Sequence, residues 1–158
     1  MGKYLKMTES RKEAVEKIRQ FNRFYTVQFD FLNRSYLDSG YSVTETRILF
    51  ELYQNERINA AGIIHKLHLD KSYISRILRG FEKNALITRQ YDSEDRRSLC
   101  LCLTQKGRQE TERLIDLTND SIYHMIGSFE QEDLERVSAD MDEIIRIFSH
   151  YHEEERGM

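Results

Sequence analysis

The chain contains no proline in its 158 residues and only seven glycines. Proline and glycine are the residues that most often end or kink helices, so long uninterrupted helices cost this chain little. Hydrophobic residues make up 39% of the sequence and charged residues 32%, which is enough for a buried core under a solvated surface. The sequence therefore predicts a mainly helical protein.

The first helix is expected over residues 8–37. Apolar residues recur in it at spacings of three and four, beginning with Val15 and Ile18. Four more aromatic or aliphatic residues widen this stripe beyond what one small domain can bury: Phe24, Val27, Phe31 and Tyr36. We therefore expect this helix to contact a second protein surface.

Three shorter helices are expected after a break at residues 38–42. Ser42 and Glu45 fit a capping box for a helix that ends near Gln54, with Thr44 as the rival cap. Asn59 is the expected cap of a second helix over residues 60–67. A third helix is expected over residues 71–84, with an apolar stripe on one side: Leu69, Ile74, Ile77, Leu78 and Phe81.

A β-hairpin is expected next. Residues 86–91 and 98–103 are β-prone and alternating, and the segment between them is polar. We expect one face of the second strand to be buried and to hold Leu99, Leu101 and Leu103, and the other face to hold Cys100 and Cys102.

Two further helices complete the prediction. The first covers residues 105–126 and begins after Thr104 as its cap; the second runs from Glu130 to Tyr151, and the residues after it are expected to be frayed. Two short helices joined by a tight turn and followed by a hairpin form a winged helix-turn-helix. The predicted fold class is therefore mainly α with a small β-hairpin wing.

Charge is distributed unevenly along the chain. Residues 57–113 hold 12 basic and 7 acidic residues, whereas residues 114–158 hold 3 and 12. A basic middle segment suits a protein that presents one face to a polyanion, although solvated charges can also cluster by chance.

The exposed side of the helix at 71–84 has the groups that duplex DNA binds. Residues near the start of such a helix reach base edges in the major groove, and flanking groups hold phosphates. Arg76 can donate two hydrogen bonds to a guanine edge, and Arg79 is better placed for a phosphate. The predicted DNA contacts on this helix are Lys71, Ser72, Tyr73, Ser75, Arg76 and Arg79.

The tip of the hairpin carries Arg96 and Arg97 after Asp95. A long cation at a hairpin tip can enter the narrow minor groove, and Asp95 can fix the direction of a neighbouring arginine. An ordinary solvated turn is the alternative explanation.

Residues 69–107 resemble the signature region of the MarR family of bacterial transcription regulators. The matching elements are Asp70-Lys71-Ser72, Ser75-Arg76, the stretch from Glu82 to Ile87, Asp92, Asp95-Arg96-Arg97, and the stretch from Leu103 to Gly107. The resemblance implies a homodimer with interlocked terminal helices, a palindromic operator and, as the usual mode, repression. It also implies that Arg97 enters the minor groove, oriented by Asp95.

That resemblance implies three regions: an N-terminal dimerisation helix over 1–41, a DNA-binding winged helix-turn-helix over 42–104, and helices over 105–158 that complete the dimerisation domain. The segments Phe21–Thr26 and Ser75–Glu82 further resemble a subgroup fused to an acetyltransferase. We expect a stand-alone regulator without that activity.

Members of this family commonly release DNA when a phenolic or other small molecule binds in a cleft beside the winged domain. The candidate lining residues are Phe24, Phe31, Tyr36, Tyr41 and Tyr53. For most of them, a core or dimer contact is the more common explanation.

Other functions receive less support from the sequence. Cys100 and Cys102 leave open a redox-responsive regulator, and a winged-helix module that binds protein instead of DNA is a further alternative. His65 and His68 lack a third metal ligand, so neither a metal nor another cofactor is expected. No catalytic motif is present, and no apolar run fits a signal peptide or a membrane span, so we expect a cytoplasmic, non-enzymatic protein.

Overall fold

The computed structural model describes residues 7–28, 38–55, 58–91 and 99–156. These residues form six helices and one two-stranded antiparallel sheet, so the predicted fold class is confirmed. In chain order the elements are α1 (Glu9–Gln28), α3 (Val43–Gln54), α4 (Ala60–Leu67), α5 (Lys71–Lys83), β1 (Ile87–Tyr91), β2 (Leu99–Leu103), α6 (Gln105–Ile126) and α7 (Gln131–Arg156).

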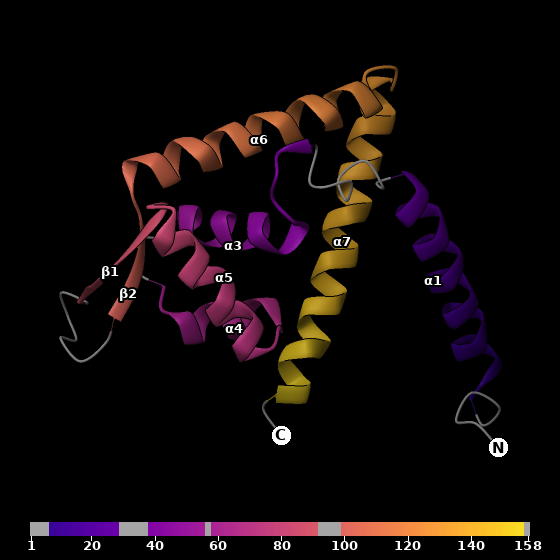
Figure 1. Cartoon of the computed structure of the whole chain (residues 1–158). Coiled ribbons are helices and arrows are strands. Elements are labelled where there is room, and N and C mark those ends of the chain that lie inside the picture. Colours follow the sequence, from indigo (N-terminus) through magenta and orange to yellow (C-terminus); the bar gives the residue numbers. More distant parts are fainter. Residues whose placement is uncertain (1–6, 29–37, 56–57, 92–98, 157–158) are drawn as a thin grey trace. The chain divides into compact units, whose positions relative to one another are not determined.

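The chain forms two compact units, Met1–Thr118 and Asn119–Met158. The first unit contains the short helices α3, α4 and α5, which gather beside the hairpin, and the first turns of α6 (Figure 1). The second contains the end of α6 and all of α7. The domain boundaries at residues 41 and 104 remain predictions.

The core of the first unit is assembled from every element between α3 and α6. The predicted apolar stripe of α5 is confirmed, because Ile74, Ile77, Leu78 and Phe81 are buried and Leu69 packs against the same cluster. Side chains from the other elements close the core around them: Ile48, Leu49, Ile63, Leu86, Leu101 and Leu114.

The predicted helix caps of α3 and α4 are confirmed. The Ser42 hydroxyl accepts from the Glu45 backbone N–H at 3.2 Å, and the Glu45 carboxylate accepts from the Ser42 N–H at 2.8 Å. Thr44, the rival cap, lies inside the helix. Asn59 accepts from the Gly62 N–H at 2.8 Å. These caps satisfy N–H groups that the first turn of each helix leaves unpaired.

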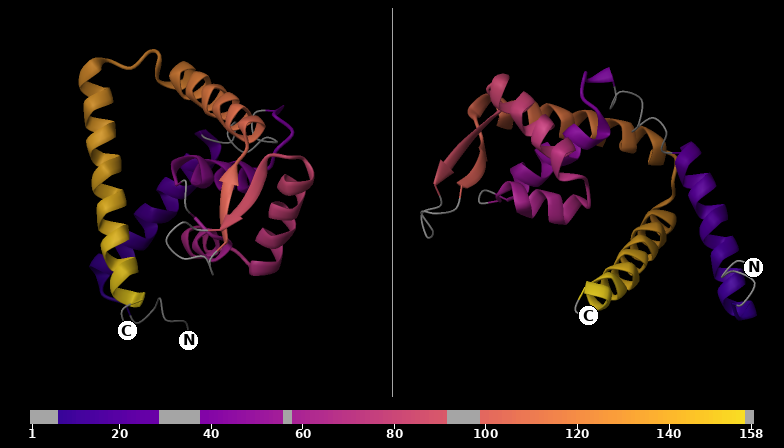
Figure 2. Two further views of the ribbon diagram at one scale, coloured as in Figure 1. Left: turned by 90° about the vertical axis from the view of Figure 1, so that its left-hand side faces the viewer. Right: turned by 60° about the horizontal axis from the view of Figure 1, so that its bottom comes forward.

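The hairpin projects from the helices of the first unit, as the views in Figure 2 show. Ile87 pairs with Leu103 at its base, and Tyr91 pairs with Leu99 at the end of the described strands. A backbone hydrogen bond of 2.9 Å from Leu101 to Ile58 attaches the other edge of β2 to the turn before α4.

The predicted alternation of β2 is wrong at two positions. Leu99 is 42% exposed, whereas Cys100 is only 5% exposed. The middle of β2 lies between β1 and the bridge at Ile58, so it is covered at both edges. Leu99 lies at the far end of the described strands, opposite the exposed Tyr91. Burial on this strand therefore follows distance from the core more closely than it follows the side-chain period.

A tight corner joins α5, the hairpin and α6. The chain leaves α5 through Ala85, whose φ of 56° is left-handed, and the Leu86 N–H donates to the Phe81 carbonyl at 2.9 Å. The Thr104 hydroxyl donates to the Ala85 carbonyl at 2.7 Å and accepts from the Gly107 N–H at 3.0 Å, which confirms Thr104 as the cap of α6. One side chain therefore bonds both the exit of α5 and the start of α6.

The terminal helices α1 and α7 bury none of their described side chains. The apolar stripe expected on the first helix is present but exposed, and its second half lies outside the described residues. Helix α7 continues to Arg156, so the expectation of a frayed tail is wrong for residues 152–156. The exposed large apolar side chains on these two helices include Ile18, Phe21, Phe24, Val27, Met141, Ile144, Ile145 and Phe148.

Replacing Gly107 by alanine is expected to lower the free energy of unfolding by about 2–4 kcal/mol. A Cβ atom at this position would lie 1.9 Å from the backbone carbonyl oxygen of Leu86, and a backbone atom cannot rotate away. Gly80→Ala is the matched control, because its Cβ would meet no atom within 4 Å and alanine is the better helix former. Urea unfolding of both variants tests this account, and equal midpoints would contradict it.

Candidate nucleic-acid interface

The N-terminus of α5 is held by Asp70. Its carboxylate accepts hydrogen bonds from the backbone N–H of Ser72 at 2.9 Å and of Tyr73 at 3.0 Å, and from the Ser72 hydroxyl. These bonds lower the pKa of Asp70, with the bond from the Ser72 hydroxyl contributing most. From the sequence, Asp70 was named only as part of the family signature and not as a cap, although aspartate directly before a helix is a typical cap.

The outer face of α5 carries three exposed cations, Lys71, Arg76 and Arg79. Within the described part of the chain, none of them forms an ion pair with a carboxylate. Arg79 Nε donates to the Ser75 carbonyl at 3.2 Å, and the Arg76 guanidinium lies 5.4 Å from the centre of the Tyr73 ring. Their positive charge is therefore not neutralised by acids of the first unit.

Several cations on neighbouring elements form ion pairs with carboxylates. Lys66 lies 2.8 Å from the Glu51 carboxylate, Arg89 lies 2.6 Å from Glu82, and Arg113 lies 2.6 Å from Glu110. Among the described residues, α5 carries four cations without a carboxylate partner, because Lys83 in its last turn has none either; Arg47 on α3 and Lys106 on α6 are single cases on neighbouring helices.

The remaining predicted contacts on α5 differ in exposure. Ser72 is exposed, whereas Tyr73 and Ser75 are half-buried, and Tyr73 packs against the hydrophobic core. The contacts predicted at the wing tip, Asp95, Arg96 and Arg97, lie outside the described residues. The structure therefore brings together the α5 part of the predicted site.

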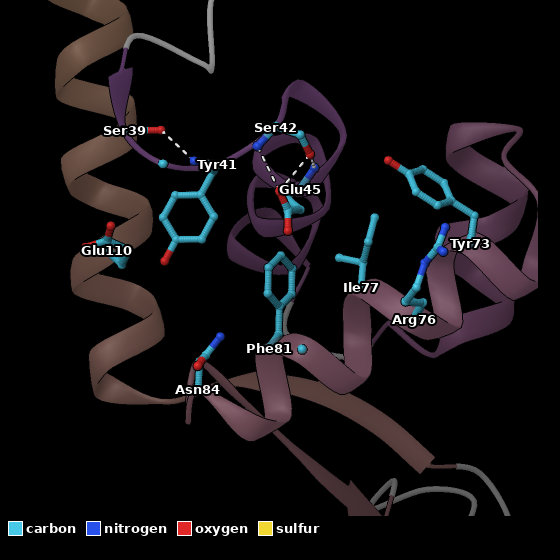
Figure 3. A pocket seen from close by; sticks show the side chains of 12 residues that line it. Ser39, Tyr41, Ser42, Glu45, Tyr73, Arg76, Ile77, Phe81, Asn84 and Glu110 are labelled. Carbon is cyan, nitrogen blue, oxygen red and sulfur yellow. Dashed lines mark hydrogen bonds between the residues drawn. The ribbon is translucent and has the colours of Figure 1, made fainter.

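An open pocket of about 610 Å³ lies between α5, the start of α3 and the first turns of α6. Figure 3 shows Ile77 and Phe81 pointing into it from α5, with the Tyr41 ring on the opposite side. Tyr73 and Arg76 also line this pocket, so it shares two residues with the outer face of α5. Of the residues that line this pocket, only Tyr41 was predicted from the sequence as a ligand contact.

Tyr53 and Phe24, the other two ligand candidates among the described residues, do not line this pocket. The Tyr53 hydroxyl donates to the Glu112 carboxylate at 3.2 Å, and the Arg108 guanidinium lies 5.3 Å from the centre of its ring. Phe24 is 59% exposed on α1. Phe31 and Tyr36 lie outside the described residues. The predicted aromatic set is therefore not gathered around one cavity in the described part of the chain.

The pKa of Tyr41 is raised above its usual value, mainly by burial and then by the nearby Glu110 carboxylate. The Tyr41 phenol therefore stays protonated at neutral pH and offers a hydrogen-bond donor to the pocket. The pKa of Arg113 is also raised, chiefly by its hydrogen bond to Glu110.

The cysteines and histidines do not form a metal centre within the described ranges. Cys100 is buried and Cys102 is half-buried, and neither forms a disulfide. The rings of His65 and His68 lie edge to face, with their centres 6.3 Å apart. None of the described helices combines the length and the apolarity that a membrane span requires.

Residues 41–99 match the sequence model of the MarR family. The organic hydroperoxide resistance transcriptional regulator of Bacillus subtilis (strain 168) is 27% identical to this chain over 99 residues. That match covers 63% of this chain and 63% of the relative, so the chain spans less than two thirds of the relative's length.

Several solved protein structures share the fold of this chain. The transcriptional regulator BldR from Sulfolobus solfataricus superposes with a TM-score of 0.67 at 20% identity, over 89% of this chain and 99% of that one. CouR from Rhodococcus jostii RHA1, solved with p-coumaroyl-CoA bound, gives a TM-score of 0.64 at 17% identity, over 79% and 88% of the two chains. Residues 41–99 thus match the MarR family model, and the chain shares the winged-helix fold of these solved structures. Its resemblance to acetyltransferase fusions remains a prediction.

Replacing Asp70 by alanine is expected to lower the stability of α5 at neutral pH. The pKa of Asp70 is lower in the folded protein, so its contribution is present above about pH 4, near the unfolded pKa, and is lost as the pH falls through the lower folded value. The difference in unfolding midpoint between the wild type and Asp70→Ala should therefore shrink in acid. Asp70→Ser, which keeps a capping oxygen that does not titrate, is the control, and a difference independent of pH would contradict the assignment.

Proposed function

We propose that this protein is a non-enzymatic transcription regulator that binds duplex DNA through α5 and the hairpin. The observation that carries the proposal is the concentration of unpaired cations on the outer face of α5, which follows α4 in a helix-turn-helix. The major groove is about 12 Å wide and admits one α-helix. A duplex-binding role also agrees with the cytoplasmic location expected from the sequence.

The residues of α5 divide into two kinds of contact. Lys71, Ser72 and Arg76 lie in its first two turns, where side chains of such helices reach base edges. Arg79 lies one turn later and is assigned to phosphate. Tyr73 and Ser75, being half-buried, support their exposed neighbours and contact DNA only at their outer edges. The proposed entry of Arg97 into the minor groove, with Asp95 orienting it and Arg96 beside it, rests on the sequence.

The DNA-bound form is proposed to be a homodimer on a palindromic operator. The apolar side chains of α1 and α7 are exposed in the single chain, and a second copy of this chain would cover them. A dimer places two copies of α5 on half-sites about one helical turn apart. This supports the proposed division into a dimerisation part, residues 1–41 with 105–158, and a DNA-binding part, residues 42–104.

Repression with release by a small aromatic ligand is the proposed mode of regulation. The pocket beside α5 supports it, because Ile77, Phe81 and the Tyr41 ring lie within its otherwise mostly polar lining, and the protonated Tyr41 phenol offers a hydrogen-bond donor. The aromatic ligand of CouR supports the same class. The contributions of Phe24, Phe31, Tyr36 and Tyr53 to ligand binding remain predictions from the sequence.

A redox response through Cys100 and Cys102 is the second candidate. The name of the hydroperoxide-resistance relative favours it, whereas the burial of Cys100 limits access of an oxidant to that thiol. A peroxide titration of DNA binding in the wild type and in Cys102→Ser separates the two modes of regulation.

Selecting bound duplexes from a random pool tests the function directly. We expect a palindrome to be enriched, and the affinity for it to fall steeply as salt rises because bound phosphates release counterions. A winged-helix module that binds protein would enrich no sequence and show no such dependence on salt.

Replacing Arg76 by alanine is expected to lower the affinity for the selected palindrome by about 5- to 100-fold and to relax the preference at one base pair. Arg79→Ala should instead weaken binding to all duplexes alike and reduce the slope against salt. Fluorescence anisotropy with single-base variants of the palindrome measures both. Uniform weakening by Arg76→Ala would assign that arginine to phosphate.

A further inference from the structure

An ion pair joins α5 to the hairpin at a distance from their shared corner. Arg89 Nε, in the middle of β1, lies 2.6 Å from the Glu82 carboxylate in the last turn of α5. The two side chains are 38% and 32% exposed. Among the residues that the structure describes, this is the one ion pair between α5 and the hairpin. The hydrogen bonds that hold the corner between α5 and the hairpin do not involve this ion pair, so its role is a separate question.

The corner itself is fixed by backbone and hydroxyl hydrogen bonds. Leu86 bonds to Phe81, and Thr104 bonds to Ala85 and Gly107. These bonds attach the hairpin at its base, where a two-stranded ribbon can still bend. The Glu82–Arg89 pair adds a second attachment farther along β1. With one attachment at its base, the hairpin could still rotate relative to α5. The second attachment fixes the angle between them.

The strand next to Arg89 is also held from its other side. Arg89 lies opposite Leu101, and Leu101 bonds to Ile58 before α4. The hairpin is therefore fixed near its middle toward α5 on β1 and toward the start of α4 on β2. The angle of the hairpin is thereby tied to both helices of the helix-turn-helix.

We propose that Glu82 and Arg89 are positioning residues for DNA binding, and that their ion pair sets the angle at which the hairpin and α5 meet one duplex. This inference rests on the proposed DNA-binding function. Two contacts on one duplex reinforce each other only when their separation and direction fit it. Fixing the angle before binding removes the loss of freedom that a loose hairpin would suffer on the duplex.

A purely electrostatic role and a positioning role predict opposite changes in DNA affinity when Glu82 loses its charge. The carboxylate neutralises Arg89 and adds negative charge close to phosphates, so Glu82→Gln should strengthen binding to any duplex through added counterion release. Positioning predicts that the same variant binds the selected palindrome more weakly. The sign of the change therefore distinguishes the two roles.

The experiment measures Glu82→Gln against two duplexes of equal length, the selected palindrome and a random sequence. We expect affinity for the random duplex to be unchanged or up to about 3-fold higher, and affinity for the palindrome to fall about 3- to 10-fold. Glu51→Gln is the matched control, because it makes the same charge change and frees Lys66 from its 2.8 Å ion pair between α3 and α4. The control should not lower affinity for either duplex.

The exchanged double variant, Glu82→Arg with Arg89→Glu, restores the ion pair with opposite polarity. We expect it to recover the ratio of the two affinities to within about 3-fold of the wild type. Thermal unfolding checks that each variant is folded, and a half-exposed pair of this kind contributes little to stability. If Glu82→Gln is unfolded, the ratio of the affinities for the palindrome and the random duplex is measured with Arg89→Met instead, and the same fall in that ratio is expected.

Binding of both duplexes by Glu82→Gln at least as tightly as by the control would overturn the positioning role. So would an exchanged variant that fails to recover the ratio. A wild-type protein that selects no duplex would instead overturn the DNA-binding proposal itself, and that result precedes any variant.

Discussion

The structure of the first unit depends on the close approach of two backbones at the corner between α5 and α6. Gly107 packs so near the Leu86 carbonyl that no side chain fits between them. The Thr104 hydroxyl bonds on both sides of this contact, and Lys106 Nζ donates to the Asn84 carbonyl at 3.0 Å. The exit of α5, the base of the hairpin and the start of α6 therefore meet at one place. A shift in one of them is transmitted to the other two through short hydrogen bonds, because there is no flexible segment to absorb it.

The local part of this architecture was predictable from the sequence. Caps such as Ser42 with Glu45, and Asn59, are set by residue types a few positions apart, and the apolar stripe of α5 follows the helical period. Burial on β2 was not predictable in the same way. It depends on the contact with Ile58, which lies more than forty residues away, and no local pattern encodes that pairing. The same reason explains why the order of exposure of Leu99 and Cys100 was predicted incorrectly.

The candidate site shows the same division. The residues of α5 were identified because polar and basic side chains recur on one face of a helix. Tyr73 and Ser75 were expected to be exposed, but both are half-buried, and Tyr73 packs against the core. The ion pair of Glu82 with Arg89 and the pocket beside Tyr41 were not predicted, since both are formed by elements that only the tertiary structure brings together.

The unpaired cations of α5 have a consequence for the free protein. Arg76 and Arg79 are three residues apart on one helix, a spacing at which like charges repel and weaken the helix. In the proposed complex, phosphates of a duplex would remove that repulsion, so DNA would stabilise this fold as a bound ligand. Salt then has opposite effects on the two states: by screening the repulsion it stabilises the free protein, and by competing for the same cations it dissociates the complex. Without DNA, α5 therefore retains the repulsion between these two arginines, which the proposed complex would relieve.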